Sequence, residues 1–205
     1  MKIEIYRPIE RLKDLLRSGW IGNVPLSAIE SVADHSFGVG VLAYLFALLE
    51  DSLRLEANMQ TLQQSPSELC VAGLFHDIAE SQYMDLDKSF TELIPDADLV
   101  KVRLDKAGTE RFVSNWKKIF SGFSEEFSKL NEFGLPNESK LFVECVDKIE
   151  LHWQALTYID KGFINPKRAE PFLKSTFQAI HSMSKRFLFI DKLQEKGLIV
   201  KITSI

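Results

Sequence analysis

The sequence predicts an all-α fold. Hydrophobic residues recur with the period of a helix along most of the chain, and no internal repeat or low-complexity segment interrupts them. The 205 residues are 45% hydrophobic, which is enough for one full-sized core. The clearest stripe, in residues 138–158, comprises Phe142, Cys145, Val146, Ile149, Trp153 and Leu156. We therefore expect residues 1–205 to form a single helical domain.

The first three helices are expected at residues 8–18, 32–53 and 67–80. Pro8 marks the first start, because proline suits the first turn of a helix. Ser31 or Asp34 is available to cap the second helix. The segment GWIGNVPLSAIES between these two helices contains two glycines and a proline, so we expect it to be a loop.

The middle of the chain is less regular. Residues 81–98 are acidic and interrupted, and we expect them to form a loop or lid segment. Further helices are expected at residues 99–121, 125–133 and 138–158, and as a pair within 169–196. The C-terminal segment GLIVKITSI is expected to form either a short strand or a tucked-in end.

Composition argues against several kinds of partner. The formal net charge of -4 is mild and basic residues are scattered, so we expect no nucleic acid polymer as partner. No signal peptide is visible, and no apolar stretch approaches the roughly 18 residues that a membrane span requires. Cys70 and Cys145 lie among apolar neighbours, which favours buried thiols in a reducing compartment over a disulfide. These features predict a soluble cytoplasmic protein with no membrane partner.

A histidine and an aspartate directly follow the apolar run LCVAGLF. Burying an unpaired charge is costly, so His76 and Asp77 require a metal ion or a partner charge. Neighbours on a helix point about 100° apart, but both donor atoms can still meet one ion beside the helix. His35 falls in line with the buried face of residues 32–53, where it could also be a core histidine bonded to a carbonyl.

Asp147 lies one step off the apolar stripe of its helix. Alone, it could be a boundary carboxylate paired with Lys148. Together with His35, His76 and Asp77 it offers two imidazoles and two carboxylates from three helices. Such a mixed set suits a divalent ion, with Mn²⁺, Co²⁺, Fe²⁺, Zn²⁺ or Mg²⁺ as candidates.

Four stretches occur in a particular order: RSGW (17–20), ESVADHSF (30–37), LFHDIAE (74–80) and VDKIELHWQALTY (146–158). Their H…HD…D order resembles that of the HD-domain metal-dependent phosphohydrolases. The resemblance is closer to one branch, the bacterial and archaeal 5'-deoxynucleotidases and their eukaryotic HD-domain-containing relatives. It extends over most of the chain.

The resemblance implies a role for each matching residue. The metal ligands would be His35, His76, Asp77 and Asp147. Glu80 would hold or deprotonate the attacking water, and Asp85 would assist the leaving 5'-oxygen.

The resemblance also implies two substrate contacts and leaves one acid open. Arg17 would contact phosphate, and Trp20 would contact the sugar or base and disfavour a 2'-hydroxyl. Because the chain reads YMDLD where the family usually has a Thr-Gly-Asp run, Asp87 is a rival to Asp85.

The implied activity is hydrolysis of deoxynucleoside 5'-monophosphates to deoxynucleosides and phosphate, by a homodimer. A cyclic-nucleotide or other phosphoester hydrolase of the same superfamily remains an alternative, as does a non-catalytic nucleotide-binding dimer. Hydrolysis of hyperphosphorylated guanosine is disfavoured, because Ser81 and Leu151 replace the acid and the asparagine typical of that family.

Three other residues have ordinary interpretations. His152 is expected to pack between helices or face solvent, and His181 to be an ordinary helix residue. Trp116 and the 15 phenylalanines are expected to form core or dimer surface rather than a base-stacking platform.

Overall fold

The computed structural model describes residues 4–86, 93–129 and 134–199. Every element named in these ranges is a helix, with two isolated β-bridges between loop segments. The all-α prediction is therefore confirmed. The chain divides into two compact units, one of residues 1–36 and 75–135, the other of residues 37–74 and 136–205. Each is described by itself, and the single domain over residues 1–205 stays a prediction.

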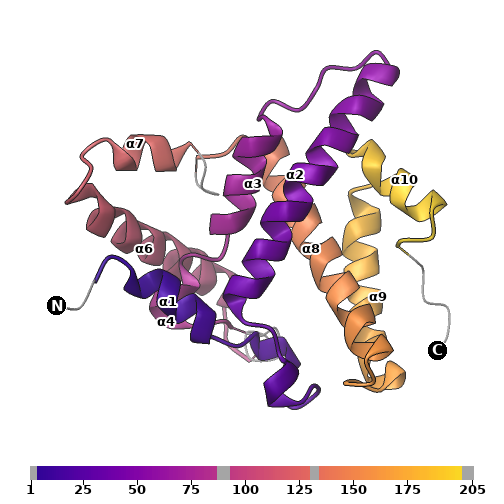
Figure 1. Ribbon diagram of the computed structural model, residues 1–205, viewed down its shortest axis with the longest axis horizontal. Helices are drawn as coiled ribbons and strands as arrows, with labels where there is room; N and C mark the ends of the chain where they lie inside the picture. The colour runs from indigo at the N-terminus through magenta and orange to yellow at the C-terminus, as the bar shows by residue number, and fades with distance from the viewer. Residues whose placement is uncertain (1–3, 87–92, 130–133, 200–205) are drawn as a thin grey trace. The chain divides into compact units, whose positions relative to one another are not determined.

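The first unit is built around α6 (Ala97–Lys117). The short helix α4 (Glu80–Tyr83) contacts both α6 and α1 (Arg7–Asp14), and α7 (Phe123–Ser128) packs against α6 (Figure 1). Two 3₁₀ turns, Ser18–Trp20 and Leu26–Ala28, connect α1 to the start of α2 (Val32–Glu56). The buried core comprises Leu12, Val32, Ile78, Phe112 and Phe127.

Aromatic rings fill much of this core. Ring centroids lie 5.1–6.4 Å apart in a cluster made of Phe75, Phe112, Trp116, Phe123 and Phe127. Edge and offset contacts of this kind add to the stabilisation that burial alone provides. Trp116 is thus a core residue, as the sequence predicts.

The second unit contains the rest of α2, most of α3 (Pro66–Phe75), α8 (Asn137–Asp160), α9 (Pro166–Ser182) and α10 (Leu188–Glu195). Helices α8 and α9 pack along one another (Figure 1). The predicted stripe of α8 is buried from Phe142 to Ile149. Helices α2 and α3 approach closely, since a Cβ added at Gly73 would lie 3.0 Å from the Cα of Gly40.

Local start signals are confirmed at two helices. Pro8 lies in the first turn of α1. At the start of α2, the backbone N–H of Asp34 donates to Ser31 Oγ at 3.1 Å, and the backbone N–H of Ser31 donates to Asp34 Oδ2 at 2.9 Å. This reciprocal capping satisfies backbone donors that a helix start would otherwise leave without partners.

Helix ends are where the sequence prediction is wrong. Helix α1 ends at Asp14 rather than residue 18, and α3 ends at Phe75 rather than residue 80. A turn over residues 76–79 follows α3, so His76 and Asp77 do not lie on a helix. The turn is held by Ile78, which is buried in the core, and by Ala79, which lies against α6.

The contact of Ala79 with α6 depends on a glycine. A Cβ added at Gly108 would lie 2.8 Å from the backbone oxygen of Ala79. Glycine therefore allows the backbone of α6 to approach the turn that carries the His-Asp pair.

The predicted loop at residues 81–98 is partly helical. It begins within α4, and α6 starts at Ala97. Residues 87–92, including Asp87, lie outside the described residues, so a lid stays a prediction. The predicted helices at 99–121 and 125–133 correspond to α6 and α7, with shifted ends. The C-terminal segment is tucked in as far as Ile199, which is buried.

Helix α2 corrects one expectation about membranes. An 18-residue window of this helix has a mean hydropathy of 1.6, so by length and composition it resembles a membrane span. Buried residues make up 44% of that window, and the core helix of a soluble protein has the same properties. Cys70 and Cys145 are free thiols, and Cys145 is buried as expected.

Candidate metal centre

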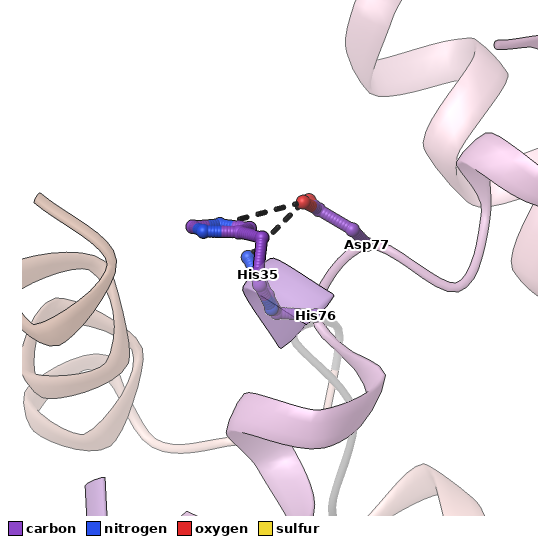
Figure 2. A group of neighbouring side chains, drawn as sticks. All are labelled: His35, His76 and Asp77. Carbon is purple, nitrogen blue, oxygen red and sulfur yellow. Dashed lines mark ion pairs between the residues drawn. The ribbon is translucent and has the colours of Figure 1, made fainter. Parts of the chain in front are cut away.

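Three of the four predicted metal ligands converge in the first unit (Figure 2). One donor atom from each of His35, His76 and Asp77 lies within 4.8 Å of the others. Asp77 Oδ2 is 3.2 Å from His76 Nε2 and 3.8 Å from His35 Nε2. The two imidazole rings are 5.2 Å apart, edge to face. His35 is fully buried, and the other two side chains are half-buried.

Two local structures fix these side chains. His35 lies in the first turn of α2, directly after the capped start at Ser31. His76 and Asp77 lie in the turn that Ile78 and Ala79 anchor against α6. Because both supports are packed, the three donor groups face one another without a shared helix.

The donor set fits a divalent ion. Two imidazole nitrogens and a carboxylate oxygen are ligands that first-row ions accept. A ligand carboxylate must be ionised. Burial alone would raise the pKa of Asp77, but the adjoining His76, and then Arg17 and His35, outweigh it and hold this pKa below its usual range.

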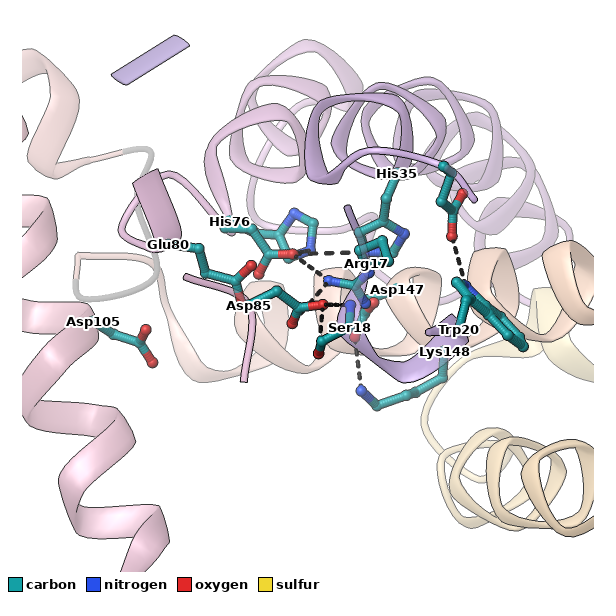
Figure 3. A network of polar contacts seen from close by, with 12 residues as sticks. Arg17, Ser18, Trp20, His35, His76, Glu80, Asp85, Asp105, Asp147 and Lys148 are labelled. Atoms are coloured by element: carbon teal, nitrogen blue, oxygen red, sulfur yellow. Dashed lines mark hydrogen bonds and ion pairs between the residues drawn. The ribbon is translucent and has the colours of Figure 1, made fainter. Parts of the chain in front are cut away.

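Arg17 and Asp85 join this cluster from two other segments (Figure 3). Arg17 Nη1 lies 3.1 Å from Asp77 Oδ2 and 3.8 Å from Asp85 Oδ1. The backbone N–H of Ser18 donates to Asp85 Oδ2 at 2.6 Å, and the Ser18 hydroxyl donates to the same oxygen at 3.1 Å. The structure therefore brings Asp85 to the RSGW turn, whereas its rival Asp87 lies outside the described residues.

Glu80 is the first residue of α4 and only 3% exposed. Burial is the main cause that raises its pKa well above the usual value, and the charges of Asp77 and Asp85 add to it. Arg17 and Lys101 act in the opposite direction. A carboxyl group with a raised pKa is suited to proton transfer near neutral pH.

Trp20 lies beside this cluster but is almost completely buried, with 2% of its surface exposed. Its indole N–H donates to Glu30 Oε1 at 3.1 Å. The contacts of Trp20 with a sugar or base, and of Arg17 with phosphate, stay predictions.

Several supporting residues were missed from the sequence. Glu30 holds Trp20, and Ser18 holds Asp85; both lie inside quoted motifs, which was the available signal. Lys101 Nζ lies 3.6 Å from Glu80 Oε1 and 3.6 Å from Asp105 Oδ2. The four-residue spacing of Lys101 and Asp105 suggests a surface pair on a helix, and nothing in the sequence connects it to Glu80.

The fourth predicted ligand, Asp147, lies on α8 in the second unit. Its Oδ2 is 2.7 Å from Lys148 Nζ, which is the pairing that the alternative interpretation predicts. Its role as a metal ligand stays a prediction.

The remaining histidines have the ordinary roles expected. His152 is buried on α8, and its Nδ1 lies 2.8 Å from Thr176 Oγ1. Burial lowers its pKa to about 4. His181 is exposed on α9 and stacks on Phe177.

Comparisons with known proteins place this geometry in context. A family model described as HD domain matches residues 9–183. A search of curated proteins gives no match. A conserved hypothetical protein from Pyrococcus furiosus is 20% identical with a TM-score of 0.61, and the similarity covers 95% of this chain and 99% of that one.

Two further solved structures are similar in fold. A protein from Pyrococcus horikoshii OT3 is 24% identical, with a TM-score of 0.60 and 96% of each chain covered. A structure from Listeria innocua described as an HD-domain phosphohydrolase is 17% identical, with a TM-score of 0.51, covering 95% of this chain and 90% of that one.

Proposed function

The chain belongs to the HD domain family, and we propose that it is a metal-dependent phosphohydrolase that converts deoxynucleoside 5'-monophosphates to deoxynucleosides and phosphate. One observation carries the proposal. The donor atoms of His35, His76 and Asp77 converge within 4.8 Å, with a guanidinium group 3.1 Å from the carboxylate. A similar fold in a Listeria innocua protein described as an HD-domain phosphohydrolase supports the reaction class.

The metal would be held by His35, His76 and Asp77, with Asp147 as the proposed fourth ligand. When bound, a divalent ion makes water a stronger nucleophile near neutral pH and neutralises charge on the phosphate. Metal identity is open among Mn²⁺, Co²⁺, Fe²⁺, Zn²⁺ and Mg²⁺, because this donor set accepts several ions.

The chain's own residues supply the other parts of the reaction. Arg17 would bind the phosphate, because a guanidinium group forms paired hydrogen bonds with phosphate oxygens. Glu80 would orient the attacking water and accept its proton, for which its buried position and raised pKa are suitable. Asp85, held by Ser18, would lie beside the departing 5'-oxygen and deliver a proton to it.

Discrimination against ribonucleotides would depend on the RSGW turn. Trp20 is fixed there by its bond to Glu30, so its bulk is rigidly placed. A rigid aromatic ring next to the sugar leaves no room for a 2'-hydroxyl. The variant Trp20→Ala should then raise turnover of ribonucleotides relative to deoxynucleotides.

The decisive experiment is phosphate release by purified, chelator-stripped protein. The substrates are ribo- and deoxynucleoside 5'-monophosphates, 3'-monophosphates and cyclic nucleotides, each with Mn²⁺, Co²⁺, Mg²⁺, Zn²⁺ or no metal. We expect metal-dependent release from the deoxynucleoside 5'-monophosphates that is lost in Asp77→Ala. The matched control is Asp191→Ala, which removes an exposed aspartate from α10.

The other outcomes choose among the alternatives. Turnover of cyclic nucleotides alone would assign the same residues to a diester substrate. Binding of nucleotides with no phosphate release under any metal would contradict the enzymatic proposal and leave a binding role.

We also infer that the protein is a homodimer, and the structure suggests a different surface from the one expected. The later phenylalanines Phe142, Phe187 and Phe189 are fully buried. On α2, in contrast, four exposed apolar side chains alternate at spacings of four and three residues: Phe37, Val41, Tyr44 and Leu48.

That alternation is typical of a helix that packs against another helix. A second copy of α2 would bury the stripe, because the pattern is complementary to itself. Light scattering should find a dimer that Leu48→Glu dissociates. An unchanged mass in Leu48→Glu would rule out this surface.

A further inference from the structure

A second polar hollow lies in the first unit, apart from the candidate metal centre. It has a volume of about 220 Å³ and is lined by Glu4, Arg7, Pro8, Arg11, Gln82, Arg111 and Asn115. Three of these residues carry a guanidinium group, and only Glu4 is acidic. In a chain with a formal net charge of -4, this is a local excess of positive charge.

The arginines reach the pocket from two helices. Arg7 and Arg11 are one turn apart on α1, and Arg111 and Asn115 are one turn apart on α6. Side chains four residues apart lie on the same face of a helix, so each helix directs one polar face to the pocket. Gln82 comes from α4, which contacts both α1 and α6.

The three guanidinium groups are not neutralised within the described part of the chain. No ion pair or side-chain hydrogen bond joins Arg7, Arg11 or Arg111 to another described residue. Like charges one turn apart destabilise a helix, and a third cation in the same hollow adds to the repulsion. Arg17 and Arg54, in contrast, each meet a carboxylate at 3.1 Å or less.

We propose that this pocket binds a multiply charged phosphate group, such as pyrophosphate or the triphosphate chain of a nucleotide. Guanidinium groups form paired, charge-assisted hydrogen bonds with phosphate oxygens. The amides of Gln82 and Asn115 add neutral donors. The volume is below the roughly 300–1,000 Å³ of pockets that enclose drug-sized ligands, so it suits a phosphate chain rather than a whole nucleotide.

The pocket and the candidate metal centre share α4. Gln82 lies two residues after Glu80 in this four-residue helix, and its amide N–H donates to Ser81 Oγ at 3.1 Å. A phosphate chain bound to Gln82 therefore contacts the helix that positions Glu80. Any effect of this ligand on turnover rests on the proposed function, whereas its binding does not.

The test is calorimetric titration of the full chain, after chelator treatment, with tripolyphosphate at low salt. The background variant Arg17→Gln removes the phosphate contact of the candidate metal centre. We expect binding in this background that falls roughly tenfold or more in Arg111→Gln, because a charge-assisted contact is lost. The matched control Arg103→Gln removes the same charge from an exposed position on the same helix and should bind unchanged.

Further arms identify the source of the phosphate. Inorganic phosphate, pyrophosphate and a nucleoside triphosphate are titrated in the same way. Affinity that rises with the number of phosphates and is equal for tripolyphosphate and the nucleotide supports a site for the phosphate chain alone. Equal affinities of Arg111→Gln and Arg103→Gln, or no binding of any phosphate by a chain with an unchanged melting temperature, would overturn the proposal.

Discussion

Arg54 in the second unit and Arg17 in the first unit each meet two carboxylates, but the charges of the two networks are matched differently. Arg54 Nε lies 2.7 Å from Glu50 Oε1, and Arg54 Nη2 lies 2.8 Å from Glu138 Oε1. Glu50 is fully buried, and its second oxygen accepts the backbone N–H of Phe189 at 2.9 Å. Both oxygens of Glu50 therefore have fixed partners.

The network of Arg17 has more carboxylates than its guanidinium group can satisfy. Asp77 and Asp85 share Arg17, and the buried Glu80 lies close enough that their charges raise its pKa. Two imidazoles complete the cluster. The comparison indicates that a buried arginine network can be structural when its donors and acceptors are matched. A surplus of carboxylates next to imidazoles is instead the arrangement that a cation would stabilise.

The largest expected effect comes from breaking the matched network. Glu50→Ala should lower the free energy of unfolding by about 3–5 kcal/mol, because Arg54 is left buried without its main partner. Urea denaturation measures this loss. Glu56→Ala, at the exposed end of the same helix, is the control and should change stability little. A similar cost for both variants would show that the Glu50 network is not structural.

The next effect is on activity in the unmatched network. Asp77→Asn should reduce phosphate release more than about 100-fold, since even residues that only support metal ligands cost 10–100-fold when replaced. Its effect on stability should be well below that of Glu50→Ala. Metal content and urea denaturation are measured on the same samples. A large loss of stability with metal binding intact would reverse the roles assigned to the two networks.

A pH titration separates burial of a histidine from ligation. His152 has a pKa lowered to about 4 by burial, whereas in the unfolded chain it takes up a proton near its usual value of 6.5. The unfolded state therefore binds more protons below about pH 6.5, and stability should fall as the pH drops from there towards 4. The loss should approach about 2–3 kcal/mol.

Urea denaturation at several pH values measures this loss, and His152→Gln should flatten the dependence. The exposed His181→Gln serves as its control and should leave the dependence as it is. An equal pH dependence in all three proteins would show that His152 is not responsible.

The smallest expected effect concerns Lys101, which lies 3.6 Å from Glu80 Oε1. Lys101→Met should lower kcat about twofold to fivefold with little change in KM, as expected for a partly exposed ion pair. Lys101→Arg should restore most of the activity because it keeps the charge. Lys106→Met, on the same helix, is the control; a loss of kcat there too would point to α6 rather than to the ion pair.

Sequence patterns located the interiors of helices and the polar motifs better than helix ends. The start of α2 is encoded locally, because Ser31 and Asp34 satisfy each other's backbone donors. The end of α3 is not encoded locally. Residues 74–80 contain no glycine or proline, and the helix stops because Ile78 is buried against Phe112 and the turn packs on α6.

The candidate site divides in the same way. His35, His76 and Asp77 were predicted, and the structure brings them together. Lys101 could not be predicted as a partner of Glu80, because their contact depends on how α6 packs against α4. Long-range packing of this kind leaves no periodic signal in the sequence.

The close approach of Gly108 to Ala79 has a consequence for interpreting sequence variation in this protein. A methyl group at position 108 would meet backbone rather than a flexible side chain, so the turn itself would have to move. That turn carries His76 and Asp77, although position 108 lies on α6 and has no reactive group. A substitution there could therefore abolish metal binding in a chain that still folds, and a survey of catalytic side chains alone would overlook it.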